Sequence, residues 1–348
     1  MRGTSLSSCM QALRRLRRSF MWLRIAPWKA LILLVLGAGF ADLGGAQDRR
    51  LPTIGVLRGS AVEAAERYLR AFLEAMRRLG WIDGQNARFV VRYADGDVRR
   101  FPALTAELVA LGVDVLYVTA PAVPAARRAT TTIPIVCADF YDPIAEGVVS
   151  SLARPGGNVT GISWQSIDSA GKRLELTTEL VPGLRRVAIL FQAGDPGAAL
   201  EVKGLLATAR RLNVTVRTFE VRDSRDIEAA FVTLRRDRVE AVIVSANPLT
   251  FSASDNIVRL ASSMKLPLIS EPGEFAKSGF LLTFGPDIVE AHKRGALYVH
   301  KILKGAKPSD LPIEQPTKFD LVINLRTARA LGLTIPEAIM VRATEVIR

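Results

Sequence analysis

The chain is poor in the side chains that most often carry catalysis, redox chemistry or metal binding. Its 348 residues include two cysteines and two histidines, and aromatic residues make up 7% of the total. Cys9 lies in the N-terminal segment, so Cys137 has no internal disulfide partner once that segment is removed. His292 and His300 share a predicted helix with no third ligand nearby, which makes a poor metal site. We expect these histidines on a solvated or interlobe helix face.

Sequence motifs of nucleotide-dependent and hydrolytic enzymes are also absent. The chain has no Gly-rich phosphate loop with lysine, no nucleophile elbow and no cluster of cysteine and histidine. Cys137 lies in the apolar run Ile133–Ala138, which predicts a buried, inert thiol rather than a nucleophile. These absences disfavour an enzyme, and we expect no bound cofactor and no metal.

Positive charge is in excess but is not clustered. The formal net charge is +13 at pH 7, and residues 1–46 hold seven Lys or Arg residues against one Asp. The remainder carries 40 basic and 33 acidic residues without a block of either sign. Because a nucleic-acid footprint needs clustered Lys and Arg, we expect no nucleic-acid partner.

The N-terminal segment has the pattern of a secretory signal. A basic flank precedes the apolar run Ala30–Phe40, and the small residues Gly44-Gly45-Ala46 follow it. A membrane span would need about 20 apolar residues, so this run is too short to cross a bilayer. We predict a signal peptide over residues 1–46, with Met21 as an alternative start, and the periplasm as the destination. The export route, Sec or twin-arginine, stays open.

From Pro52 onward, short apolar strands alternate with helices of amphipathic spacing, which is typical of a parallel sheet. The first series of expected elements is Thr53–Leu57, Glu63–Leu79, Ala87–Tyr93, Phe101–Leu111, Val113–Val118, Pro121–Ala129 and Ile133–Cys137. The second series runs from Ser169–Leu180 through Arg186–Phe191, Gly197–Leu212, Val214–Val221, Ile227–Arg236, Ala241–Ser245, Ser254–Met264 and Leu266–Ile269.

Two interruptions separate these series. A turn-rich stretch precedes the strand Asn158–Ser163, and a second break comes at Phe280–Gly285 before the helix Asp287–Leu303. We predict an α/β fold of two Rossmann-like lobes with parallel sheets, joined by hinge strands at about 158–164 and 280–286. The predicted lobes comprise residues 51–160 with 285–317, and residues 161–284 with 318–348.

Ligands of open parallel sheets bind beyond the carboxyl ends of the strands, next to helix N-termini. Thr119 ends a strand before a helix, and its hydroxyl together with the N–H group of Ala122 predicts a site for a carboxylate. The alternative is that Thr119 only caps the helix. Ser60 follows another strand end. Asp142 would bind an ammonium group, or would serve as a turn residue before Pro143.

Four further candidates lie at such loop positions. Tyr141 and Trp164 would stack on an apolar or aromatic part of a ligand, although aromatic residues there more often belong to the core. Gln192 and Asn247 offer amide donors and acceptors, with a solvent-exposed loop as the competing interpretation.

Several segments resemble one family, the bacterial ABC-transporter substrate-binding proteins of the tryptophan/tyrosine-uptake type. The similarity runs from about Leu51 to Arg348, so it covers the whole mature chain. The segments that carry it are Ile54–Leu57, Glu74–Gly84, Ile133–Val136, Asp142-Pro143, Ser151–Ser163 and Lys301–Leu333.

The resemblance implies a type I periplasmic binding protein with three hinge crossings and a solute held between the lobes. Four segments depart from the family's usual pattern: Thr119-Ala120 stands for Gly-Thr, Gln192-Ala193 for Asn-Pro, Asn247 for Asp, and Phe284 for Tyr. A cleft with fewer carboxylates would hold an ammonium group less firmly, so a solute without a free amine stays open.

The resemblance and the missing motifs together predict the extracytoplasmic solute-binding component of an ABC importer. It would be a monomer that closes on a small carboxylate-bearing solute, an aromatic or other amino acid, and delivers it to a membrane permease and its ATPase. One alternative is a ligand-sensing domain for a membrane receptor. The other is a two-lobed α/β enzyme such as a racemase, which needs an acid–base pair across the cleft.

Overall fold

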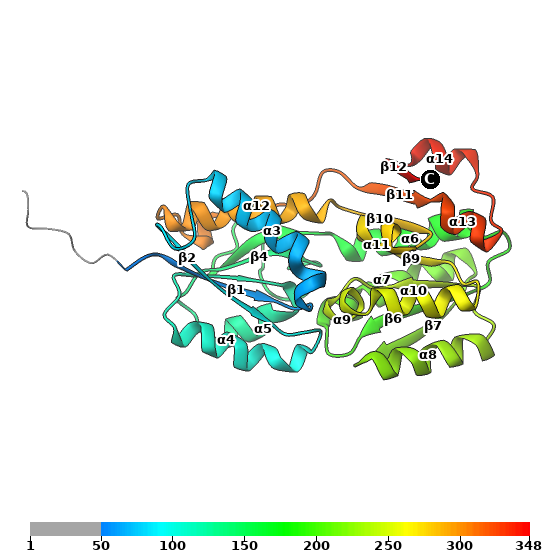
Figure 1. Ribbon diagram of the computed structural model, residues 1–348, viewed down its shortest axis with the longest axis horizontal. Helices are drawn as coiled ribbons and strands as arrows, with labels where there is room; N and C mark the ends of the chain where they lie inside the picture. Colours follow the sequence, from blue (N-terminus) through cyan, green and yellow to red (C-terminus); the bar gives the residue numbers. More distant parts are fainter. Residues whose placement is uncertain (1–49) are drawn as a thin grey trace, which may run out of the picture. The chain divides into compact units, whose positions relative to one another are not determined.

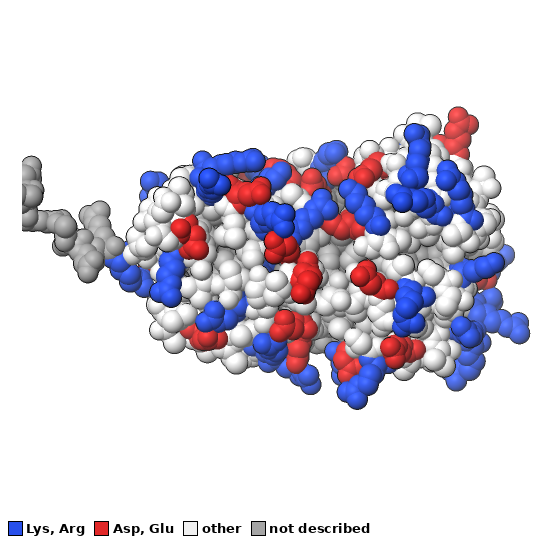
Figure 2. All heavy atoms as spheres, in the orientation of Figure 1, with Lys and Arg blue, Asp and Glu red and all other residues white. Residues whose placement is uncertain are grey.

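The computed structural model describes residues 50–348, so the predicted signal peptide lies outside the described part of the chain. Residues Leu51–Arg348 form one compact unit. Within the described residues, no helix combines the length and the apolar character that a membrane crossing demands. On the face shown in Figure 2, basic and acidic side chains are interspersed.

The first lobe is built on a five-stranded parallel sheet in the order β2-β1-β3-β4-β5 (Figure 1). Every residue of the interior strand β1 is buried, because helices cover both faces of a parallel sheet. The strands are β1 (Thr53–Arg58), β2 (Arg88–Tyr93), β3 (Val115–Val118), β4 (Ile135–Phe140) and β5 (Val159–Ser163).

Two apolar clusters cover the faces of this first sheet. On one face, Phe72 and Met76 of α3 (Val62–Arg78) pack together with Ala296 of α12 (Ile288–Leu303). On the other face pack helices α4 (Phe101–Ala110) and α5 (Val123–Ala129), the latter preceded by the 3₁₀ turn η2 (Ala120–Ala122). Helix α12 comes from late in the sequence and therefore returns the chain to the first lobe.

The second lobe has a seven-stranded sheet in the order β12-β11-β10-β9-β8-β6-β7. All its neighbouring strands run parallel except β10 and β11, which pair antiparallel. The strands are β6 (Arg186–Gln192), β7 (Thr215–Val221), β8 (Ala241–Val244), β9 (Leu268–Ser270), β10 (Leu282–Gly285), β11 (Asp320–Asn324) and β12 (Glu345–Ile347).

Helices cover both faces of the second sheet as well. One face carries α6 (Ser166–Leu180), α7 (Pro196–Leu212), α13 (Leu325–Leu331) and α14 (Glu337–Arg342). The other face carries α8 (Ser224–Arg236), α9 (Pro248–Ser252), α10 (Ser254–Ser263) and α11 (Gly273–Ser278). Short 3₁₀ turns η1 (Val98–Arg100) and η3 (Pro308–Asp310) complete the first lobe.

The chain passes between the lobes three times. It leaves β5 through Trp164 and Gln165 to enter α6, and Gln165 adopts a left-handed backbone with φ of 54°. It returns after β10 through Pro286 and Asp287 into α12, and it crosses again beyond Glu314 to reach β11. Before this last crossing, Ile162 and Glu314 form an isolated parallel bridge.

The structure corrects the predicted position of the hinge segments. Strand β5 pairs with β4 as far as Ser163, so the lobe boundary expected between residues 160 and 161 falls inside a strand of the first sheet. Strand β10 lies between β9 and β11 of the second sheet. Because a sheet ladder pairs the backbone N–H and C=O groups of both segments, the crossings are the short loops that follow them.

Candidate functional site

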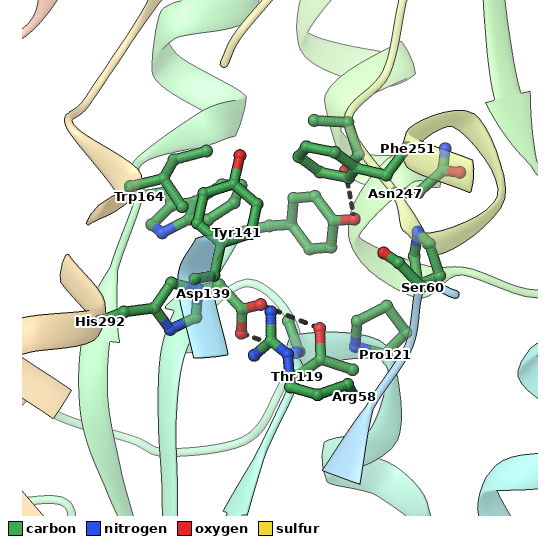
Figure 3. Close-up of a pocket in the computed structure, with 15 residues that line it drawn as sticks. Arg58, Ser60, Thr119, Pro121, Asp139, Tyr141, Trp164, Asn247, Phe251 and His292 are labelled. Carbon is green, nitrogen blue, oxygen red and sulfur yellow. Dashed lines mark hydrogen bonds between the residues drawn. The ribbon is translucent and has the colours of Figure 1, made fainter. Parts of the chain in front are cut away.

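Between the lobes lies a small pocket, which we call the interlobe pocket (Figure 3). Its cavity volume is about 30 Å³, and its walls come from strand ends of both sheets and from helices α3, α9 and α12. The residues that line it are Arg58, Ser60, Tyr68, Thr119, Ala120, Pro121, Asp139, Tyr141, Trp164, Ala246, Asn247, Pro248, Phe251, Ile288 and His292.

Arg58 brings a positive charge into this pocket. It is the last residue of β1, and only 5% of its surface is exposed. Its Nε atom is buried without a hydrogen-bond partner, and Arg58 forms no ion pair with any carboxylate in the described part of the chain. A guanidinium cannot lose its charge in a protein, so the chain buries a cation at this wall without pairing it within the described residues.

Asp139 occupies the position where a bound carboxylate was expected. Its two carboxylate oxygens accept hydrogen bonds from the Thr119 hydroxyl and from the backbone N–H of Ala120, each at 2.9 Å. The N–H of Ala122 donates to the Thr119 carbonyl at 2.9 Å and is therefore not free for a ligand. The predicted anion site is filled by the protein's own carboxylate, which leaves Arg58 as the cation for a ligand.

Aromatic side chains form much of the remaining wall. Tyr68 of α3 meets Phe251 of α9 edge to face, with ring centroids 5.7 Å apart and an interplanar angle of 81°. Trp164 is buried and donates from its indole nitrogen to the Ala138 carbonyl at 3.1 Å. Tyr68 belongs to the first lobe and Phe251 to the second, so aromatic packing already crosses the cleft.

His292 adds a neutral ring to the pocket. Burial lowers the pKa of His292 well below its usual value, and the positive charge of Arg58 lowers it further. Its Nδ1 atom shares a hydrogen bond with the Tyr117 hydroxyl, and its ring lies 5.2 Å from that of Tyr68. His292 is therefore on an interlobe face, as expected, and not on a solvated one; His300 instead meets the Trp81 indole nitrogen through its Nδ1 at 3.0 Å.

Five of the eight residues predicted from the sequence line the interlobe pocket: Ser60, Thr119, Tyr141, Trp164 and Asn247. Ala122, Asp142 and Gln192 do not. Asp142 is a turn residue, since one of its carboxylate oxygens accepts the N–H groups of Ile144 and Ala145 at 3.0 Å each.

Gln192 and Asn247 have structural hydrogen bonds. The Gln192 side-chain amide donates to the Gly96 carbonyl of the first lobe and accepts from the Leu249 N–H at 3.2 Å, so it connects the lobes. The Asn247 side chain lines the pocket but also caps α9, accepting from the Thr250 N–H at 3.0 Å.

The candidates selected from the sequence did not include five of the pocket residues: Arg58, Asp139, Tyr68, Phe251 and His292. Arg58 and Asp139 did carry a signal, because both lie at the carboxyl ends of parallel strands. The other three come from helices α3, α9 and α12, and their approach depends on how the two lobes meet. No group of three residues able to hold a metal ion occurs within residues 50–348.

The chain is similar in sequence and fold to several known proteins. The "Tyrosine-binding protein" of Clostridioides difficile (strain R20291) is 26% identical over 289 residues, which are 82% of this chain and 82% of that protein. A Streptococcus pneumonia ABC domain solved in complex with L-Trp has a TM-score of 0.78 at 27% identity, and the alignment covers 86% of this chain and 100% of that one.

A conserved domain protein from Vibrio cholerae is similar to the same extent. It has a TM-score of 0.80 at 26% identity and covers 85% of this chain and 100% of its own length. Residues 54–347 match the model of the family described as ABC transporter substrate binding protein, which spans both lobes and the interlobe pocket. The chain therefore belongs to the ABC transporter substrate-binding protein family.

Proposed function

We propose that this protein is the extracytoplasmic component of an ABC importer and that it binds an aromatic α-amino acid of the tryptophan or tyrosine type. The observation that carries the proposal is Arg58, a buried guanidinium without a counter-ion among the described residues, at the wall of a pocket between two lobes. A carboxylate that forms a bidentate pair with this group would satisfy it.

The charges around the pocket suit a zwitterion. Arg58 would hold the α-carboxylate, and Asp139, which is 7% exposed, would face the α-ammonium group. A carboxylate has about four lone-pair positions, so Asp139 can accept from a ligand in addition to Thr119 and Ala120. Asp139 thus supplies the negative charge that the sequence assigned to Asp142, which favours a solute with a free amine.

The aromatic wall suits the side chain of such a solute. The rings of Tyr68, Trp164 and Phe251 offer apolar surface and edge-to-face contacts to an indole or a phenol. Two similar proteins support this assignment by their names, one as a tyrosine-binding protein and one solved with L-Trp. We infer that ring stacking against these residues selects aromatic over aliphatic amino acids.

Binding would proceed by closure of the lobes. The walls of the interlobe pocket come from both lobes, and Arg58 and Asp139 at these walls are buried, so an amino acid would reach them when the lobes have moved apart. A ligand that contacts both lobes in the closed form shifts the equilibrium toward that form. The three crossings would absorb the rotation, and the closed form is what the permease would recognise.

The remaining assignments follow from this role. We propose that residues 1–46 direct export to the periplasm, that the mature chain acts as a monomer, and that a membrane permease and its ATPase are its partners. The lobes that rotate would be residues 51–163 with 288–314, and residues 166–285 with 320–348.

A binding experiment on one substitution tests the proposal. Arg58→Met removes the charge at nearly constant length, so the affinity for L-Trp or L-Tyr measured by calorimetry should fall by at least about 30-fold, the low end for losing a buried charge pair. Arg128→Met is the matched control, because Arg128 is exposed on α5 and should leave affinity unchanged.

Stability distinguishes this effect from unfolding. Removing a buried charge that has no counter-ion should leave the melting temperature of the ligand-free Arg58→Met protein equal or higher. Wild-type affinity in Arg58→Met would overturn the assignment of Arg58, and wild-type protein that binds neither amino acid would overturn the proposed ligand class.

A further inference from the structure

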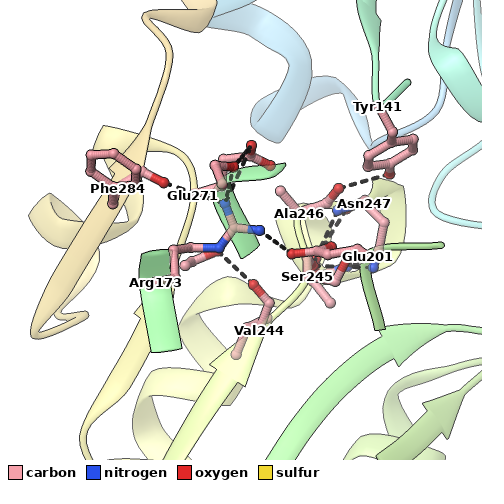
Figure 4. A network of polar contacts seen from close by, with 12 residues as sticks. Tyr141, Arg173, Glu201, Val244, Ser245, Ala246, Asn247, Glu271 and Phe284 are labelled. Atoms are coloured by element: carbon pink, nitrogen blue, oxygen red, sulfur yellow. Dashed lines mark hydrogen bonds and ion pairs between the residues drawn. The ribbon is translucent and has the colours of Figure 1, made fainter. Parts of the chain in front are cut away.

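Tyr141 connects the two lobes through a single hydroxyl group. It follows β4 of the first lobe, and its Oη atom lies 2.8 Å from Asp195 Oδ2 and 2.8 Å from the Ala246 carbonyl oxygen, both in the second lobe. Figure 4 shows Tyr141 reaching Ala246 above the buried residues of the second lobe. Tyr141 and Asp195 are both almost fully buried.

The number of hydrogens decides how these contacts are made. A tyrosine hydroxyl carries one hydrogen, and a carbonyl oxygen and an ionised carboxylate carry none. With Asp195 ionised, one of the two 2.8 Å oxygen–oxygen contacts would lack a hydrogen. With Asp195 protonated on Oδ2, Asp195 donates to Tyr141, and Tyr141 donates to the Ala246 carbonyl.

The other carboxylate oxygen leaves Oδ2 available for this proton. Asp195 caps helix α7, and it does so through Oδ1 alone, which accepts from the N–H groups of Gly197 and Ala198 at 3.1 and 3.4 Å. When Oδ2 is protonated, each hydrogen bond of the Asp195 carboxyl and the Tyr141 hydroxyl has its own hydrogen. The hydrogen bonds that cap helix α7 through Oδ1 are kept.

We propose that Asp195, Tyr141 and the Ala246 carbonyl form a proton-dependent clasp, in which closing the lobes favours the protonated form of Asp195. The inference rests on the proposed function only in that both involve movement of the lobes. In the open form Tyr141 leaves, and the cap at the positive end of α7 favours the ionised carboxylate. A lower pH therefore stabilises the closed form.

Two neighbouring carboxyl groups, Glu201 and Glu146, favour the protonated form of Asp195. Glu201 lies six residues after Asp195 on α7 and forms a buried ion pair with Arg173. Glu146 shares a cavity of about 360 Å³ with Asp195, Arg127 and Arg128. The two arginines are exposed at the rim. Burial, together with the smaller effect of the Glu201 charge, raises the pKa of Asp195 to about 6 in spite of its hydrogen bonds.

Ligand-free protein provides the test. Dyes on Arg77→Cys of α3 and Arg235→Cys of α8 report the distance between lobes by single-molecule energy transfer, since Cys137 is buried. We take the pKa of Asp195 as about 6 in the closed form and as the ordinary 3.8 in the open form. The ratio of closed to open molecules should then rise about tenfold from pH 7 to pH 5.

Two variants isolate the clasp. Asp195→Asn keeps the helix cap and presents an amide donor to Tyr141 at every pH, so its closed fraction should be high and independent of pH. Tyr141→Phe lacks the hydroxyl that accepts the Asp195 proton but leaves the carboxyl buried, so its rise from pH 7 to pH 5 should be smaller than tenfold.

Glu146→Gln is the control, because it removes the neighbouring carboxyl and should keep the tenfold rise. A wild-type ratio that stays constant between pH 7 and pH 5, or an Asp195→Asn protein that responds like wild type, would overturn the clasp. Neither outcome involves a ligand, so a failure to bind L-Trp would bear on the proposed function alone.

Discussion

Arg58 shows how the requirements of folding and of binding differ at a single residue. A charge buried without a counter-ion destabilises the folded chain, and an apolar residue of similar length at the end of β1 would pack without that cost. Sites that must bind a charged ligand retain such groups at the expense of stability. Under the proposed function, Arg58 is buried because the pocket binds an anionic group and not because the first lobe needs this residue to fold.

Burial of His292 should make the stability of the protein depend on pH. The pKa of His292 is lower in the folded protein than the value of about 6.5 in the unfolded chain. The unfolded chain therefore binds a proton at His292 more readily, so the free energy of unfolding falls as the pH drops below about 6.5. Between pH 7 and pH 5 the loss amounts to about 2 kcal/mol. Urea unfolding of His292→Gln should therefore show a decline in unfolding free energy that is smaller than the wild-type decline by about that amount.

His300→Gln is the appropriate comparison, since His300 lies on the same helix but is only half buried. Its unfolding free energy should decline between pH 7 and pH 5 as the wild type does. Equal declines in His292→Gln and wild type would show that His292 becomes protonated without leaving its buried position.

The length of one strand explains why the sequence identified some pocket residues and missed others. Thr119, Tyr141 and Asn247 were predicted because carboxyl ends of parallel strands meet at one edge. Strand β4 was expected to end at Cys137, but it continues to Phe140, so Asp139 lies within the strand and Asp142 within the turn. Because the predicted strand ended three residues too early, Asp142 was selected as the pocket carboxylate in place of Asp139.

At the scale of elements, the long helices and buried strands were predictable and the short ones were not. Helix α3 repeats its apolar residues at helical spacing over 17 residues, which gives a clear signal. Helix α9 has only five residues and is defined by the Asn247 capping box, and α11, α14 and β12 are comparably short. Such elements form because the lobes around them fix their ends, which no local pattern reveals.

The N-terminus of helix α7 meets the first lobe so closely that only glycine fits there. A Cβ atom on Gly197 would lie 1.9 Å from Cδ2 of Tyr141, which belongs to the other lobe. Gly197→Ala should therefore leave each lobe folded but strain the closed form by about 1–3 kcal/mol, which lowers the affinity for L-Trp roughly 5- to 150-fold in calorimetry.

Gly157→Ala is the matched substitution, because a Cβ atom there would meet nothing within 4 Å. It should bind as the wild type does. If Gly197→Ala also retained wild-type affinity, helix α7 and Tyr141 would not approach each other in the form that binds the solute.

At the scale of the whole molecule, the lobes are held together by contacts that do not involve a ligand. Besides Tyr141 and Gln192, the Ala61 N–H donates to the Ser252 hydroxyl at 3.0 Å, and Arg67 pairs with Glu274 at 3.5 Å. Exposed ion pairs and single hydrogen bonds each contribute about 1 kcal/mol or less. Their sum is small enough for a ligand to decide between open and closed forms.

Small-angle scattering on the chain without residues 1–46 measures the equilibrium between open and closed forms directly. Because the walls of the interlobe pocket come from both lobes, the ligand-free protein should populate open forms, and saturation with L-Trp should lower its radius of gyration. Gly197→Ala should keep the larger value at the same L-Trp concentration, since its closed form is strained. If calorimetry showed tight binding while the scattering curves with and without L-Trp coincided, the lobes would not move, and the solute would have to reach Arg58 by a local rearrangement of the aromatic wall.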